Sequence, residues 1–118
     1  MILSVRPIFM HLEIDTTNKD LLIELVGKPP FRQVGESIPA PDGVSLVYEG
    51  MIERRGLDFP TTVQFLVQHI DDVAIALFSS WLYDKLKDRA RRLRANGQEI
   101  QLTPEAVRRI FERHTKNR

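Results

Sequence analysis

The sequence contains no cysteine, and it has little that would place it in a membrane. The missing cysteine excludes a disulfide scaffold, a thiolate nucleophile and a cysteine-ligated zinc or iron–sulfur site. The two longest uncharged apolar stretches, residues 59–70 and 73–83, span only 12 and 11 residues, whereas a membrane-spanning helix needs roughly 20. The N-terminus lacks the pattern of a signal peptide, and the six glycines form no recognised phosphate-binding loop. We therefore expect a cytoplasmic protein with no cofactor and no membrane span.

The length and the charge distribution bound the organisation of the chain. With 118 residues and 13.7 kDa, the chain has enough material for one domain, residues 1–118, and not for two. The formal net charge is only +1. However, residues 1–83 carry 6 basic and 11 acidic side chains, and residues 84–118 carry 11 basic and 5 acidic ones. The basic C-terminal third raises the question of a polyanionic partner.

Alternation of apolar and polar residues predicts the strands. Residues 10–14 alternate, and residues 3–9 alternate in the opposite phase, which indicates one strand with a bend. Residues 61–69 are rich in β-branched and aromatic side chains and predict a better-defined strand. Residues 98–102 predict a short one. Residues 44–54 fit a strand or a helix, and we favour a strand.

Capping residues and helical periodicity predict three helices. The first spans residues 19–26, between a capping Asn18 and a terminating Gly27. The second is long and runs from Asp71 to about Asn96, where an Asn-Gly pair indicates its end. A third helix follows a Thr-Pro-Glu start near the C-terminus. Its inner face comprises Val107, Ile110, Phe111 and His114.

The predicted order of elements is β-α-β-β-α-β-α. It matches an α+β fold of the ferredoxin-like β-α-β-β-α-β type, with a four-stranded antiparallel sheet and an added C-terminal helix. Two helices would then cover one face of the sheet. Because such a fold hosts many functions, the order of elements does not identify one.

The basic residues of the C-terminal third are candidates for a polyanion or nucleic-acid site. These candidates are Arg91, Arg92, Arg94, Arg108, Arg109 and Arg113. On a helix, the basic residues between positions 85 and 94 flank the apolar stripe on both sides, with Asp84 and Asp88 between them. Long basic side chains that lie over the edges of the core explain this pattern. We therefore favour a solvated helix over a nucleic-acid site, and the two aspartates also oppose binding to anionic lipid.

The only closely spaced cluster of metal-ligand types is weak. His69, Asp71 and Asp72 lie where a strand leads into a helix. The two aspartates are also typical of a helix start, and a metal site would need a further ligand from elsewhere. Ser79 and Ser80 lack the strand–turn–helix context of an exposed nucleophile. We therefore predict no metal and no catalytic residue.

Trp81 is the only tryptophan and the best candidate for an interface residue. It lies about 120° from the centre of the apolar stripe that contains Phe78 and Leu82. Either another part of the chain, such as the proline-rich loop at residues 27–43 or the last helix, covers Trp81, or a second copy of the protein covers it. Since Ala74 and Leu77 lie beside it, we favour a second copy, with Trp81 as the anchor.

The segment 80–87 carries a family resemblance. It reads Ser-Trp-Leu-Tyr-Asp-Lys-Leu-Lys and is followed by a basic run, an Asn-Gly pair, a short strand and a terminal helix. In this it resembles small uncharacterised bacterial proteins that share a "WLYDKLK" helix. More distantly it resembles the effector-associated constant components of bacterial conflict systems, although it lacks their hydrophobic span and has an extra helix. The resemblance covers residues 60–112, provides no catalytic residue, and implies an adaptor or regulatory role.

From these patterns we expect a non-enzymatic, homo-oligomeric interaction module with an unknown protein partner. An antiparallel sheet with helices on one face leaves edges and an open face to be covered. A polyanion-binding module that uses the C-terminal arginines is the first alternative. A small metal-dependent enzyme centred on His69 is the second.

Overall fold

The computed structural model describes residues 10–28, 30–54, 56, 59–68 and 73–116, without the side chains of residues 42 and 114–116. Its strands are β1 (Met10–Thr16), β2 (Ser37–Ile38), β3 (Ser45–Ile52), β4 (Thr61–Gln68), β5 (Arg92–Ala95) and β6 (Gln98–Ile100). Its helices are α1 (Lys19–Val26), the 3₁₀ turn η1 (Pro41–Gly43), α2 (Ile75–Leu86) and α3 (Pro104–Lys116). None of the helices in these residues is long and apolar enough to cross a membrane.

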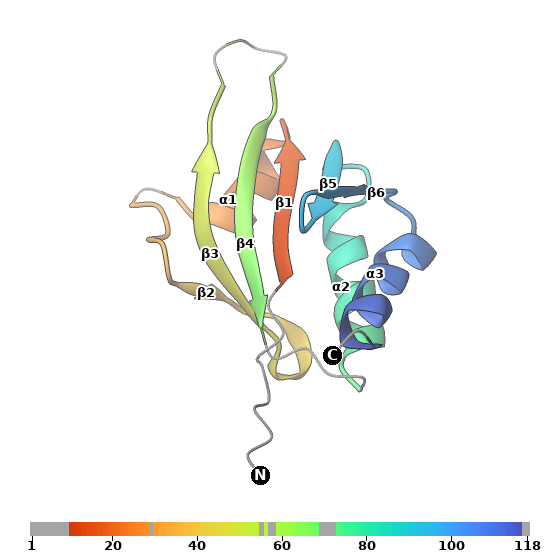
Figure 1. Cartoon of the computed structure of the whole chain (residues 1–118). Helices are drawn as coiled ribbons and strands as arrows, with labels where there is room; N and C mark the ends of the chain where they lie inside the picture. Colours follow the sequence, from red (N-terminus) through yellow and green to blue (C-terminus); the bar gives the residue numbers. More distant parts are fainter. Residues whose placement is uncertain (1–9, 29, 55, 57–58, 69–72, 117–118) are drawn as a thin grey trace.

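The strands form one antiparallel sheet in the order β2-β3-β4-β1-β5-β6 (Figure 1). The α+β class and the antiparallel sheet are confirmed. The four-stranded ferredoxin-like order is not confirmed, because the sheet has six strands. We expected the strand at residues 98–102 to be the fourth, but a strand that the sequence analysis placed in a helix, β5, lies next to β1 instead. The expected strand is β6, which pairs with β5 at the edge of the sheet.

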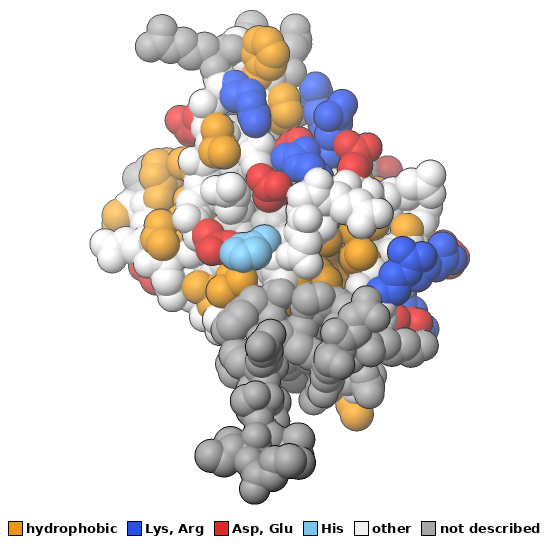
Figure 2. All heavy atoms as spheres, in the orientation of Figure 1, with side chains coloured by type: hydrophobic (Ala, Val, Ile, Leu, Met, Phe, Trp, Pro, Cys, Tyr) orange, Lys and Arg blue, Asp and Glu red, His pale blue; other side chains and the backbone are white. Residues whose placement is uncertain are grey.

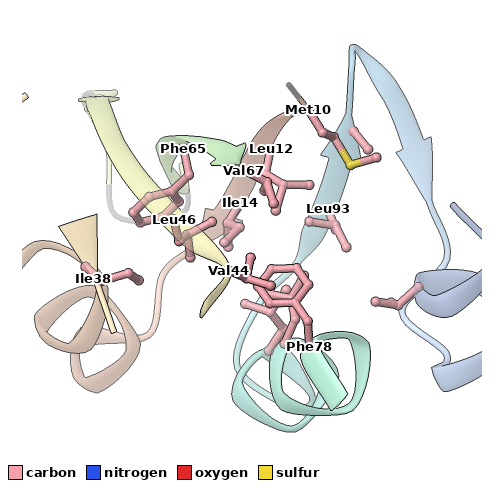
Figure 3. Packing of buried hydrophobic residues seen from close by; sticks show 14 of the residues in the cluster. Met10, Leu12, Ile14, Ile38, Val44, Leu46, Phe65, Val67, Phe78 and Leu93 are labelled. Atoms are coloured by element: carbon pink, nitrogen blue, oxygen red, sulfur yellow. The ribbon is translucent and has the colours of Figure 1, made fainter. Parts of the chain in front are cut away.

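The core lies between the sheet and the helices, which cover one side of it (Figures 1 and 3). Alternate residues of the central strands point into it, including Leu12 and Ile14 on β1 and Phe65 on β4 (Figure 3). Phe78 of α2 meets the ring of Phe111 of α3 edge to face, with the ring centroids 5.1 Å apart. This aromatic contact fixes α3 on α2.

Helix α1 begins and ends where the sequence predicts. The side chain of Asn18 accepts a hydrogen bond from the backbone N–H of Leu21 at 2.8 Å, which satisfies one of the free donors of the first turn. Gly27 ends the helix at a φ of 83°, a conformation that favours glycine.

Strand β3 confirms the preferred reading of residues 44–54. Its register against β4 shifts between Tyr48 and Gly50, so that one extra residue, Glu49, interrupts the alternation. Leu46 and Tyr48 point to the core before this bulge and Met51 after it. The bulge therefore explains why the apolar pattern of this segment fitted a helix as well as a strand.

The long helix predicted from Asp71 to Asn96 is wrong. Helix α2 starts at Ile75, its N-cap is Ala74 without a capping side chain, and it ends at Leu86. The chain then turns through a positive φ of 60° at Asp88. The residues expected to cap the helix, Asp71 and Asp72, lie outside the described residues, as does the bend expected in the N-terminal strand.

Pairing with β1 explains why residues 92–95 form a strand. The backbone N–H of Arg91 donates to the carbonyl of Asp15 at 2.7 Å, and the hydroxyl of Thr16 donates to the carbonyl of Arg89 at 2.6 Å. Leu93 then lies opposite Ile14 and enters the core. An apolar residue at this position satisfies both the helical period and the strand period, and tertiary pairing decides between them.

The Asn96-Gly97 pair is a hairpin turn and not a helix stop. Both residues have positive φ, 49° and 82°, and they join β5 to β6. Two successive residues with positive φ form the turn that matches the twist of a two-stranded ribbon, and Asn-Gly is its preferred sequence. The side chain of Asn96 also accepts a hydrogen bond from the backbone N–H of His11 at 2.9 Å.

Candidate functional site

The face of the sheet opposite the helices carries mainly polar side chains. On β1, residues 10, 12 and 14 are buried in the core, so His11, Glu13 and Asp15 point to this open face. Glu13 lies opposite Gln64 on β4 and Arg94 on β5. Acidic and basic side chains are interleaved over the central strands (Figure 2). The open face is therefore a surface of mixed charge.

Asp15 and Arg94 form the central ion pair of this face. The two terminal nitrogens of Arg94 donate to the two carboxylate oxygens of Asp15, each at 2.8 Å. The hydroxyl of Thr62 donates to Asp15 Oδ1 at 2.7 Å, and Arg54 Nη1 donates to the Thr62 hydroxyl at 2.8 Å. Only 8% of the Asp15 side chain is exposed. The network links β1, β4 and β5.

The electrostatics of the network favour a structural role. Burial alone works to raise the pKa of Asp15, but hydrogen bonds from Arg94 and Thr62, and the charges of Arg94 and Arg54, lower it below its ordinary value of 3.8. The hydrogen bonds to Asp15 raise the pKa of Arg94. Both groups are therefore charged at neutral pH and bound to each other. A carboxylate with these partners is a poor general base.

The candidate metal ligands His69, Asp71 and Asp72 all lie outside the described residues. Among the described residues, no group of three or more His, Asp or Glu side chains could hold a metal ion. His11 points outward on β1 as expected, and its Nδ1 lies 3.0 Å from Glu49 Oε1. The side chain of His114 is not among those that the structure describes.

The six candidate arginines do not form one basic patch. Arg94 is held by Asp15, and Arg108 on α3 donates to Glu112 at 2.8 Å. Arg92 is exposed on β5, with its Nε 3.8 Å from a carboxylate oxygen of Glu99. Because Arg94 and Arg108 are hydrogen-bonded to carboxylates and Arg92 lies near one, the positive charge that these three offer to a phosphate backbone is reduced.

Of the other three arginines, Arg91 lies apart from Arg109 and Arg113. Arg91 is exposed in the turn that leads into β5. Arg109 and Arg113 lie one helical turn apart on α3 and line a hollow beside β6. Lys and Arg side chains are visible at this margin of the molecule, over α3 (Figure 2).

Trp81 lies at the margin of the core. Its ring stacks on Phe78, with the centroids 5.8 Å apart, and the ammonium group of Lys85 lies 5.1 Å from the ring centroid. The tryptophan is half-buried in its own chain. Leu77 is 49% exposed, as expected for an interface residue, whereas the side chain of Ala74 is 2% exposed and is covered by its own chain.

Val73, Leu77 and Trp81 form a row on α2 and its N-terminal extension, which we call the α2 stripe. Leu77 and Trp81 are four positions apart and lie on one side of α2, and Val73 lies four positions before Leu77, in the turn that precedes the N-cap Ala74. Val73 is 84% exposed and is the most exposed of the large apolar side chains described. The small residues Ala76 and Ser80 lie beside the row and are also exposed. Large apolar side chains of the α2 stripe therefore project beside a surface of small side chains.

A hollow of about 200 Å³ lies between α2 and α3, next to the α2 stripe. It is lined by Ala76, Ser79, Ser80, Pro104, Glu105 and Arg108. The hydroxyl of Ser79 is buried there and has no hydrogen-bond partner among the described residues.

A second apolar hollow lies between α1 and β3. It has a volume of about 260 Å³ and is lined by apolar side chains with Lys19 and Glu53 among them. Ile23 and Phe31 line it and are 43% and 51% exposed. This hollow is an alternative to the α2 stripe as a contact surface for another protein.

The Asp15 network and the buried hydroxyl of Ser79 are not among the residues predicted from the sequence. The alternation of acidic residues on β1 and of arginines at positions 92 and 94 is a usable signal for the network, once 92–95 is read as a strand. The helical period does distinguish Ser79 from Ser80: with Ile75 at 0° on the apolar stripe, Ser79 lies at about 40° and Ser80 at about 140°. Ser79 is accordingly buried and Ser80 exposed.

Comparison with known proteins identifies no relative: no protein-family model, no curated protein and no solved structure matches this chain.

Proposed function

We propose that this protein is a non-enzymatic interaction module that self-associates through the α2 stripe. The observation that carries the proposal is the row of exposed apolar side chains at Val73 and Leu77, which continues to the half-buried Trp81. Large apolar side chains in a row at helical spacing are typical of contacts between helices. Tryptophan is enriched among the residues that dominate binding energy.

The surroundings of the α2 stripe support contact with a second helix. Ala76 and Ser80 let a neighbouring backbone approach closely, because their side chains are small. The adjoining hollow between α2 and α3 leaves room for side chains of an incoming helix. A two-fold pair of α2 helices brings the same groups from both copies together.

An adaptor role in a bacterial conflict system is the finer form of this proposal. It is supported by the WLYDKLK resemblance, since residues 81–87 coincide with the C-terminal half of α2. The cytoplasmic location and a relation to the ferredoxin-like fold likewise remain proposals from the sequence.

Sedimentation velocity of the purified protein at micromolar concentration tests self-association. We expect the wild type to sediment as a dimer and Leu77→Glu to sediment as a monomer, because two buried carboxylates would face each other across the interface. Ile23→Glu is the matched control, since Ile23 is a similarly exposed apolar residue on a different helix, α1. It should leave the dimer intact.

Two results contradict the proposal. One is a wild type that is monomeric throughout the micromolar range. The other is a dimer that Ile23→Glu dissociates and Leu77→Glu does not, which would place the contact at the α1 hollow. Circular dichroism of each variant checks that the fold is retained.

A further inference from the structure

The hollow between β6 and α3 combines an open strand edge with two arginines. It has a volume of about 150 Å³. One wall consists of Gln98, Glu99, Ile100 and Gln101, and the other of Ala106, Arg109, Ile110 and Arg113. A groove between a strand edge and a helix is a common site for an extended peptide.

Strand β6 is an edge of the sheet. Among the described strands it pairs with β5 on one side and with none on the other. Alternate residues of an antiparallel strand direct their N–H and C=O groups away from the partner strand, so part of the backbone of Gln98–Ile100 is unpaired by β5. An unpaired strand edge is a template for a further strand, because its N–H and C=O groups need partners.

Arg109 and Arg113 supply the charge of this groove. Both are exposed, and neither has an acidic partner among the described residues, in contrast to Arg108, which is bound to Glu112. The one carboxylate in the lining, Glu99, lies 3.8 Å from Arg92. The groove therefore has uncompensated positive charge beside its strand edge.

We propose that the β6–α3 groove binds an extended acidic peptide segment of a partner protein, which adds to β6 as a further strand. Carboxylates of the peptide bind Arg109 and Arg113, and Ile100 and Ile110 provide an apolar floor for the side chains between them. The two arginines are separated by about 6 Å along the helix. Alternate side chains of a strand are separated by about 6.6 Å, so the carboxylates of a Glu-x-Glu pattern have a spacing similar to that of the two arginines.

Charge argues against two other occupants of the groove, namely β6 of a second copy and residues 1–9 of the same chain. Pairing of β6 with β6 of a second copy would bring two pairs of Arg109 and Arg113 together, and like charges across an interface are unfavourable. Residues 1–9 of the chain contain no Asp or Glu, so this segment would leave the arginines without partners. An acidic peptide satisfies both the charge and the strand edge.

Fluorescence anisotropy with a labelled peptide, Thr-Glu-Val-Glu-Val-Glu-Thr, tests the proposal. We expect saturable binding in the micromolar range, and a loss of about tenfold or more in affinity for Arg109→Glu with Arg113→Glu. Arg108→Glu is the control, because it makes the same charge reversal as each of these two substitutions, on the neighbouring side of α3. It should bind the peptide within about twofold of wild type.

Strand addition is tested separately from charge. The same peptide with alternate backbone nitrogens methylated keeps its carboxylates but cannot donate along one edge, so it should lose most of its affinity. Equal binding of the methylated peptide overturns the proposal. So does equal or tighter binding of a labelled single-stranded oligonucleotide, or no binding of the peptide at all.

This inference rests on the proposed role as an interaction module, but it uses a different surface. Leu77→Glu should abolish self-association and leave peptide binding unchanged. The double arginine variant should lose peptide binding and keep the dimer. Failure of one proposal is thus separable from failure of the other.

Discussion

At Asp15 the carboxylate lies where β1, β4 and β5 meet, and its partners come from two of these strands. Arg94 binds both of its oxygens and Thr62 binds one of them. Such a pair is expensive to break, because Arg94 would keep only its longer contact with Glu13, at 3.4 Å. The exposed Arg92 on the same strand has only a distant carboxylate. The two arginines therefore differ in their expected contribution to stability.

Replacing Asp15 tests this difference. We expect Asp15→Ala to lower the free energy of unfolding by about 2 to 4 kcal/mol, because Arg94 loses its main partner at a largely buried position. The control Arg92→Met should change it by no more than about 0.5 kcal/mol, since this side chain is solvent-exposed. Urea denaturation measures both. Equal effects of the two substitutions would show that the network contributes nothing specific.

The lowered pKa of Asp15 also predicts a pH dependence. In the folded protein this carboxyl holds its proton less tightly than in the unfolded chain, so its contribution to stability is complete above its ordinary pKa. The contribution is lost as the pH falls below 3.8 and through the folded value. Urea midpoints measured across the acid range should fall more steeply for wild type than for Asp15→Asn. Parallel curves of urea midpoint against pH for the two proteins would contradict the claim that ionised Asp15 stabilises the fold.

At the scale of elements, the sequence predicts those strands and helices whose local signals agree with one another. Helix α1 has a capping asparagine, an apolar face and a terminating glycine, and it lies where these residues place it. Strand β4 is rich in β-branched and aromatic side chains and was predicted to within one residue. Where signals conflict, prediction fails. The segment 92–95 has good helix formers, and only its pairing with β1 makes it a strand.

The hairpin at Asn96-Gly97 is tested by Asn96→Ala. In the turn, Asn96 has a φ of 49° and its side chain binds the N–H of His11, so we expect a loss of about 1 to 2 kcal/mol. At the end of a helix the same change would be neutral or stabilising, because alanine is the best helix former. Gln98→Ala is the control for an exposed neighbour. Thermal unfolding measures the difference, and an unchanged midpoint for Asn96→Ala would contradict the turn.

At the scale of the whole molecule, length predicts one domain, the order of the expected elements predicts the α+β class, and side-chain periodicity predicts an exposed flank on α2. These signals do not predict which apolar residues are exposed or where grooves form on the surface. Ala74 seemed to belong to the interface by helical position, but packing covers it, and Val73 is exposed in its place. The β6–α3 groove escapes prediction because it depends on the hairpin that brings β6 beside α3. Surfaces arise from tertiary contacts that the local pattern does not contain.

The self-association of the molecule through the α2 stripe is tested most directly by the emission of Trp81, the only tryptophan. Its ring is half-buried in one chain, so an interface would bury it further. On dilution from high micromolar to nanomolar concentration, we expect the wild-type emission maximum to shift to longer wavelength. Leu77→Glu should show the long-wavelength maximum at every concentration. A wild-type maximum that does not change with concentration, together with a monomeric mass, would contradict the account.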